Sequence, residues 1–240
     1  MTTTALVTGS TRGIGLAIAK RFCHDGIDVI ANYRTDEEQA KKALRELQEI
    51  RPTARAIRAD VCDETQVRRL ISEALRGGSG IDILVNNVGS FAFTPLLETP
   101  LDEWDHILRS NLTSTFLCCR EVIPHMRERV RGCIVNIASM NAGIPRATPN
   151  TLPYAIANTG VALLTRTLAR IVGPDRIRVN AVSPGFVEGA DFSPADARKQ
   201  ISLERTAHPN EIADVVSFLV SENASYVTGA VVDVHGGALL

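Results

Sequence analysis

The stretch TGSTRGIG, Thr8–Gly15, indicates the fold of this 240-residue chain. It follows a short apolar run and precedes a segment with helical spacing of apolar residues, Gly13 to His24. Glycines in a strand–helix turn let the main chain approach a phosphate without a Cβ in the way, and the helix start offers free N–H groups. The stretch predicts a nucleotide-binding turn, although a plain glycine-rich turn would have the same sequence.

Apolar strands and helical segments alternate along the rest of the chain. Further strands are expected at 27–33, 54–61, 81–87, 132–139, 176–185 and 229–237, and further helices at 36–50, 64–76, 101–129 and 152–172. The 101–129 helix is expected to bend or break near Pro124. The strands are continuously apolar, as in a parallel sheet with helices on both faces. The pattern predicts an α/β, doubly wound Rossmann fold, and residues 1–240 show no linker that would divide it.

Composition and charge narrow the class of protein. The formal net charge of −1 gives no basic field for nucleic acid, and the apolar runs are too short to span a membrane. The first residues lack the pattern of a signal peptide, so we expect a cytoplasmic protein. The five cysteines show no metal-binding spacing, so we expect reduced thiols and no metal site.

The end of the second expected strand bears on the choice of nucleotide. NAD sites usually place an acidic residue there to hold the ribose 2′-hydroxyl. This chain has Asn32 and Arg34 there, with Arg12 inside the glycine turn. Two guanidinium groups suit a 2′-phosphate, which favours NADP(H) over NAD(H). Arg34 as a merely solvated loop residue is the alternative.

Four further short motifs extend the pattern along the chain: ADV at 59–61, NNVG at 86–89, SNL at 110–112 and SPG at 183–185. Together with Thr8–Gly15, Ser139 and Tyr154, they resemble the short-chain dehydrogenase/reductase family over the whole chain and in the family's order. The tail from Glu204 to Gly237 is similar to the 3-oxoacyl-[acyl-carrier-protein] reductase branch. The resemblance implies a seven-stranded parallel sheet in the order 3-2-1-4-5-6-7. It also implies a homo-oligomer, tetramer or dimer, formed through two long helices and the last strand.

The resemblance also implies the site residues. The NADP(H)-binding residues would be Gly9, Ser10, Thr11, Arg12, Gly13, Ile14, Gly15, Arg34, Asp60, Val61, Asn87, Gly89, Tyr154, Asn158, Pro184, Gly185 and Val187. The catalytic residues would be Asn111, Ser139, Tyr154 and Asn158.

The implied roles are those of a carbonyl reductase. Tyr154 would donate a proton to the carbonyl oxygen, Ser139 would hydrogen-bond that oxygen, and Asn111 would support a water-mediated proton path. Asn158 stands where the family has a lysine, whose charge lowers the pKa of the tyrosine. A neutral amide impairs oxidation, which needs tyrosinate, more than reduction, which needs the neutral acid.

The expected function is therefore NADPH-dependent reduction of a small ketone. A non-redox activity (dehydration, cyclisation or isomerisation) and a catalytically impaired cofactor-binding subunit are the alternatives. The substrate loop, about 186–203, is polar, with Glu188 and Asp191, and favours a compact polar carbonyl compound. The loop between Ser139 and Tyr154 is longer than the family commonly shows. It is either harmless length variation or a reshaped substrate wall that brings in Arg146.

Overall fold

A computed structural model describes residues 3–76, 80–140, 142–143, 146–189 and 197–238. Its sheet has seven parallel strands in the order β3-β2-β1-β4-β5-β6-β7, which confirms the predicted fold class and strand order. The strands are β1 Thr4–Val7, β2 Asp28–Tyr33, β3 Arg55–Arg58, β4 Ile83–Asn86, β5 Gly132–Ile137, β6 Ile177–Pro184 and β7 Val231–Val234.

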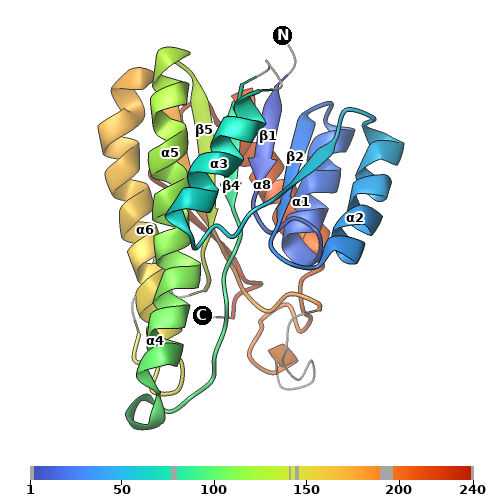
Figure 1. Cartoon of the computed structure of the whole chain (residues 1–240). Coiled ribbons are helices and arrows are strands. Elements are labelled where there is room, and N and C mark those ends of the chain that lie inside the picture. Colours follow the sequence, from blue (N-terminus) through green and yellow to red (C-terminus); the bar gives the residue numbers. More distant parts are fainter. Residues whose placement is uncertain (1–2, 77–79, 141, 144–145, 190–196, 239–240) are drawn as a thin grey trace.

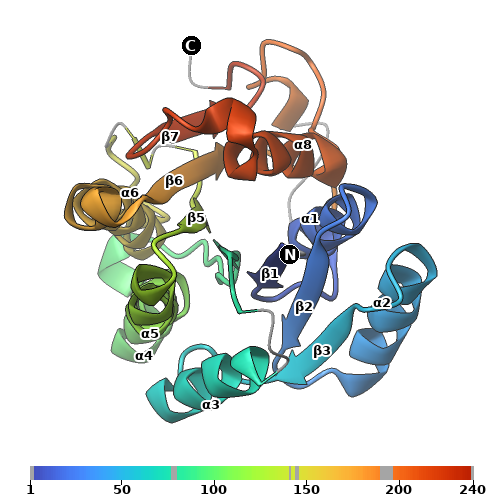
Figure 2. The same ribbon diagram turned by 90° about the horizontal axis from the view of Figure 1, so that it is seen from above.

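Helices cover both faces of this sheet (Figures 1 and 2). On one face lie α1 Gly13–His24, α2 Glu37–Ile50 and α8 Pro209–Val220. On the other lie α3 Glu64–Leu75, α4 Leu101–Leu108, α5 Ser114–Glu128 and α6 Leu152–Val172. Adjacent residues of β1 pack into the two apolar cores on opposite faces of the sheet. Leu6 lies in the core that contains Met126, and Val7 lies in the core that contains Phe22. This is why the strands are apolar without alternation.

The long helix expected at 101–129 is interrupted, but at a different place. The break is a π-helical turn, Arg109–Thr113, whereas Pro124 lies inside α5. The side-chain amide of Asn111 donates to the main-chain oxygen of Ile107 at 2.9 Å. A side chain that competes for a helical carbonyl in this way disturbs the regular hydrogen-bond ladder.

The helix α8 was not predicted from the sequence. Its start is well marked, because His208 and Glu211 form reciprocal capping hydrogen bonds, with Pro209 at the first position. In the part of the chain that the structure describes, no helix is long and apolar enough to cross a membrane.

Candidate active site

Side chains from the neighbouring strands hold the glycine turn between β1 and α1. The amide of Asn87, just after β4, donates to the main-chain oxygens of Thr8 and Gly9 at 3.1 and 3.2 Å. Asn32 of β2 accepts the Gly9 N–H at 3.3 Å. A Cβ on Gly15 would lie 2.5 Å from the Gly9 oxygen and 2.6 Å from the Asn87 amide nitrogen. The predicted glycines thus let helix, turn and β4 meet closely.

The first turn of α1 is open to an anion. Arg12 is the N-cap residue but makes no side-chain capping hydrogen bond, and the first turn holds no acidic residue. Gly13 adopts a φ of 54° and, with Ile14, lines a cavity beside the turn. The free N–H groups and the helix dipole therefore suit a phosphate group, and the residues present fit the diphosphate of a dinucleotide.

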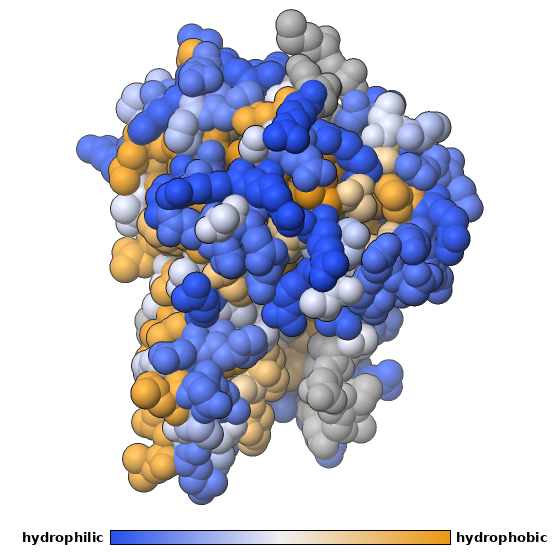
Figure 3. All heavy atoms as spheres, viewed as in Figure 1, coloured by the Kyte–Doolittle hydropathy of each residue, from blue (hydrophilic) through white to orange (hydrophobic). Residues whose placement is uncertain are grey.

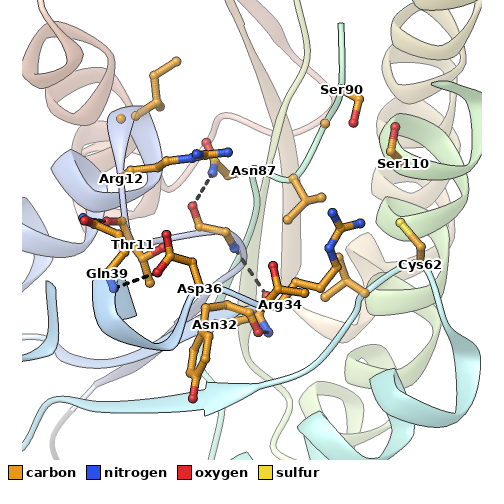
Figure 4. A pocket seen from close by; sticks show the side chains of 18 of the residues that line it. Thr11, Arg12, Asn32, Arg34, Asp36, Gln39, Cys62, Asn87, Ser90 and Ser110 are labelled. Atoms are coloured by element: carbon orange, nitrogen blue, oxygen red, sulfur yellow. Dashed lines mark hydrogen bonds between the residues drawn. The ribbon is translucent and has the colours of Figure 1, made fainter. Parts of the chain in front are cut away.

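The cavity has a volume of about 570 Å³ and lies at the carboxyl ends of β1, β2 and β4 (Figure 4). The predicted cofactor residues that line it are Gly9, Thr11, Arg12, Gly13, Ile14, Arg34, Val61, Asn87, Gly89 and Val187. The predicted residues outside its lining are Ser10, Gly15, Asp60, Pro184, Gly185, Asn111, Ser139, Tyr154 and Asn158. All four predicted catalytic residues therefore lie outside the lining of this cavity, which is formed mainly by residues of the glycine turn and of the segments after β2, β3 and β4.

Ser10, although predicted to bind the cofactor, is fully buried. Its hydroxyl donates to the Val7 oxygen at 2.8 Å and accepts the Asn32 N–H at 3.1 Å. The hydroxyl of Ser10 therefore joins β1 to β2 below the turn.

Both predicted arginines line the cavity, but they are not the only charges there. The Arg34 guanidinium lies 3.9 Å from the Asp60 carboxylate, and its side chain is 60% exposed. Asp36 also lines the cavity, together with Arg12 (Figure 4). Its carboxylate accepts the N–H of Gln39 at 2.9 Å as the N-cap of α2. A carboxylate thus lies among the groups expected to hold a 2′-phosphate.

Asp36 was missed because the prediction considered only the end of β2. The signal that would have found it is the sequence DEEQ, Asp36–Gln39, which marks a helix start right after that strand. Cys62 was also missed, and it differs from the other cysteines, which are buried, by being half-buried and lining the cavity. Burial raises the pKa of the Cys62 thiol to about 11, and Asp60 adds to the rise.

Ser139 and Tyr154 come together near the carboxyl end of β5. The Tyr154 side chain is hydrogen-bonded with Ser139, and its ring meets that of Phe91 edge-on, with centroids 5.1 Å apart. Burial raises the pKa of Tyr154 above its usual value of 10, and the hydrogen bond with Ser139 opposes the rise. The tyrosine is therefore protonated at neutral pH and can act as an acid.

Asn158 lies one helical turn after Tyr154 on α6 and is buried. Its side-chain amide donates to the main-chain oxygen of Tyr154 at 2.9 Å. The amide is therefore held along the helix, and it carries no charge to lower the pKa of the tyrosine.

Asn111 faces the segment after β4. Its amide donates to the Ser90 oxygen at 2.8 Å, and its Oδ1 lies 2.4 Å from where a Cβ on Gly89 would stand. Gly89 therefore admits the side chain of Asn111, which fixes the start of the β4–α4 connection.

Three of the predicted cofactor residues lie at the end of β6: Pro184 is its last residue, and Gly185 and Val187 follow it. Pro184 accepts the Met140 N–H at 2.8 Å, which ties β6 to the loop after Ser139. A Cβ on Gly185 would lie 2.7 Å from the main chain of His235, so a glycine is needed there. Of the predicted substrate loop, 186–203, residues 190–196 with Asp191 lie outside the described residues. Across the described residues, no group of three or more His, Cys, Asp or Glu side chains could hold a metal ion.

Comparison with known proteins agrees with this arrangement. The family model described as enoyl-(acyl carrier protein) reductase matches residues 9–238. The chain is 37% identical to 3beta-hydroxysteroid dehydrogenase 1 of Eggerthella lenta, over 99% of this chain and 94% of that protein. It is 34% identical to a 3-oxoacyl-[acyl-carrier-protein] reductase of Staphylococcus aureus, over 99% of this chain and 98% of that protein.

Solved structures of other proteins share this fold. A mutant of a short-chain dehydrogenase/reductase of Serratia marcescens superposes with a TM-score of 0.93, at 30% identity, over 99% of this chain and 98% of that chain. A dehydrogenase/reductase of Sinorhizobium meliloti superposes with a TM-score of 0.92, at 34% identity, over 99% of this chain and 95% of that chain. With its fold, the geometry of its glycine turn and these matches, the chain belongs to the short-chain dehydrogenase/reductase family of oxidoreductases.

Proposed function

We propose that this chain is an NADPH-dependent oxidoreductase that reduces the carbonyl group of a small ketone. The observation that carries the proposal is the contact between Ser139 and Tyr154, with the tyrosine held in its protonated form by burial. A hydroxyl that keeps its proton at neutral pH is the acid that a carbonyl reduction needs. Residues 1–240 would form one NADP(H)-binding domain, with 186–203 as its substrate loop.

Each side chain of the site has a separate role in the proposed reduction. NADPH, when bound, supplies a hydride for the carbonyl carbon. Tyr154 transfers its hydroxyl proton to the carbonyl oxygen, which becomes the alcohol oxygen, and water restores the proton. Ser139 donates a hydrogen bond to the same oxygen and stabilises its growing negative charge. Asn111 holds the segment after β4 in place through its hydrogen bond to Ser90, so its role is to position that segment beside the site.

Asn158 bears, in this proposal, on which protonation state of Tyr154 is available for the reaction. The family resemblance places a lysine at its position, and the amide cannot supply that charge. Without the charge the tyrosine stays neutral, which suits reduction and disfavours oxidation. The same substitution supports the second candidate, an acid–base activity without hydride transfer, since Ser139 and Tyr154 remain in contact.

NADP(H) is proposed as the cofactor because Arg12 and Arg34 line the cavity. Guanidinium groups bind phosphate oxygens with charge-assisted hydrogen bonds. Asp36 and Asp60 reduce this preference, since each places a negative charge near the phosphate position. The expected preference for NADPH is therefore modest.

We also propose that the chain forms a homo-oligomer through α5 and α6. Apolar spheres gather on this side of the molecule in Figure 3. Phe116 on α5 is 42% exposed, and Leu163 and Ile171 on α6 are 65% and 54% exposed. Contiguous apolar surface of this kind is typical of interfaces. Light scattering after size exclusion distinguishes a monomer, which would contradict this proposal, from a dimer or tetramer.

The activity is tested by nucleotide binding followed by turnover. NADPH and NADH are titrated by fluorescence, and NADPH oxidation is then followed with a panel of ketones. Binding with turnover that is lost in Tyr154→Phe is the expected result. Failure to bind either nucleotide contradicts the proposal. Binding without turnover, in wild type and in Asn158→Lys, would instead favour the non-redox activity.

A further inference from the structure

The segment 90–98, which we call the β4–α4 strap, crosses the reacting end of the site and is tied down at both ends. The Ser90 oxygen accepts the amide of Asn111 at 2.8 Å. Further along, the N–H of Thr94 donates to the Asn150 oxygen at 2.8 Å, and the N–H of Leu96 donates to the Pro149 oxygen at 2.9 Å. The strap is therefore joined to the longer loop that precedes Tyr154, and the two segments form one wall.

Phe91 lies between these ties. Its ring meets the Tyr154 ring at an interplanar angle of 87°, the edge-to-face arrangement that aromatic pairs prefer. The side of Phe91 that does not meet Tyr154 remains open, because the residue is 56% exposed. A large apolar ring that lies against the ring of Tyr154 and is still half-exposed offers surface that a ligand can cover.

The geometry points to Phe91 as a specificity-determining residue that stacks against an aromatic ring of the substrate, so that the preferred substrates are compact aryl ketones. This inference rests on the proposed carbonyl reduction. A ketone whose carbonyl oxygen reaches Ser139 and Tyr154 has its nearest substituents beside Phe91, since that ring contacts the tyrosine itself. A flat ring gains both apolar burial and an aromatic contact there, whereas a saturated ring of the same size gains burial only.

The polar character of the loop 186–203 favoured a compact polar compound, and that loop is described only in part. The strap supplies the aromatic wall on the side that is described. We therefore still expect a compact substrate, but an aryl ketone in place of a polar compound.

The test compares two ketones of similar size, acetophenone and cyclohexyl methyl ketone, in the wild type and in variants. The ratio of their kcat/KM values is expected to fall about tenfold in Phe91→Ala and in Phe91→Leu, the second of which keeps an apolar side chain. Comparing this ratio between proteins cancels the intrinsic reactivity of each ketone. The matched control is Phe218→Ala on α8, which removes a phenylalanine of similar exposure, 49%, and is expected to leave the ratio unchanged.

A binding readout keeps this inference separate from the proposed activity. Saturation-transfer NMR with acetophenone and the NADP⁺-bound protein, which has no hydride to transfer, is expected to show contact at the aryl protons in the wild type and to lose it in Phe91→Ala. If no ketone oxidises NADPH, the proposed function fails, and the NMR result still decides the role of Phe91. An unchanged kcat/KM ratio, or aryl contact that persists in Phe91→Ala, would overturn the inference.

Discussion

The side-chain amide of Asn158 donates a 2.9 Å hydrogen bond to the main-chain oxygen of Tyr154, one helical turn before it. Both residues thus belong to one turn of α6, and the only group that Asn158 brings to the tyrosine is neutral. The proton affinity of Tyr154 is set by burial, with Ser139 in opposition.

Replacing Asn158 by lysine is expected to lower the pKa of Tyr154, because a nearby positive charge favours tyrosinate. In the wild type, burial raises the pKa of Tyr154 and reduction needs its protonated hydroxyl, so the rate of reduction should stay level through neutral pH and fall only in strongly alkaline solution. In Asn158→Lys this fall should move to lower pH, and alcohol oxidation should gain more than ketone reduction. The measurement is kcat against pH in both directions.

The control for this change is Asn158→Gln, which keeps a neutral amide and should keep the wild-type pH profile. Identical profiles for Asn158→Lys and Asn158→Gln would show that charge at this position does not act on Tyr154.

Replacing Asp36 by asparagine is expected to tighten NADPH binding about fivefold and to leave NADH binding nearly unchanged. The change removes a negative charge from the cavity, while asparagine remains a good N-cap for α2. Glu37→Gln is the matched control, because it removes the same charge from the next residue, which pairs with Lys41. Fluorescence titration gives the dissociation constants. Equal effects of the two substitutions on NADPH would contradict a specific role for Asp36.

Adding a methyl group at Gly15 is expected to destabilise the fold by about 1–3 kcal/mol and to abolish nucleotide binding, since the new Cβ meets main chain and the Asn87 amide. Gly173→Ala is the control: nothing lies within 4 Å of its Cβ position, and its φ of −55° suits alanine. Chemical denaturation and NADPH titration measure the two effects. A Gly15→Ala protein that binds NADPH normally would show that the close contact can relax.

NADPH is expected to protect Cys62 from alkylation, because this thiol lines the cavity proposed to hold the nucleotide. Its pKa of about 11 means that the reactive thiolate is scarce at neutral pH. Labelling by iodoacetamide should therefore rise about tenfold for each pH unit up to about 11. Cys23, with a pKa also raised by burial to about 11 but only 3% exposed, should label slowly with or without NADPH. Peptide mass spectrometry follows each site, and equal Cys62 labelling with and without NADPH would place the nucleotide elsewhere.

Periodicity predicted the strands well, because each buried strand is a short apolar run between polar turns, as at Ile83–Asn86. It failed at the π-helical turn, where one side chain, Asn111, competes with the main chain for the oxygen of Ile107. The spacing of apolar residues in a sequence does not reveal such a local competition between a side chain and the main chain.

Motifs located residues whose surroundings the structure then shows: Gly9 lines the cavity, Gly15 lets α1 approach the turn, and Tyr154 lies beside Ser139, while their binding and catalytic roles stay predictions. The site was less predictable where segments distant in sequence meet. Neither Phe91 against Tyr154 nor the tie between Thr94 and Asn150 has a local signal, since both depend on how two loops fold over the end of the sheet. The hydrogen bonds by which Asn32 and Asn87 hold the glycine turn in place could also not be predicted from the sequence.

The hydrogen bonds of Asn32 and Asn87 hold the glycine turn in one shape, so we expect the main chain proposed to bind phosphate to rearrange little when a nucleotide arrives. Capture should then cost little loop-ordering entropy, and association should be fast. Exchange of the spent nucleotide in each cycle would be governed by its departure alone.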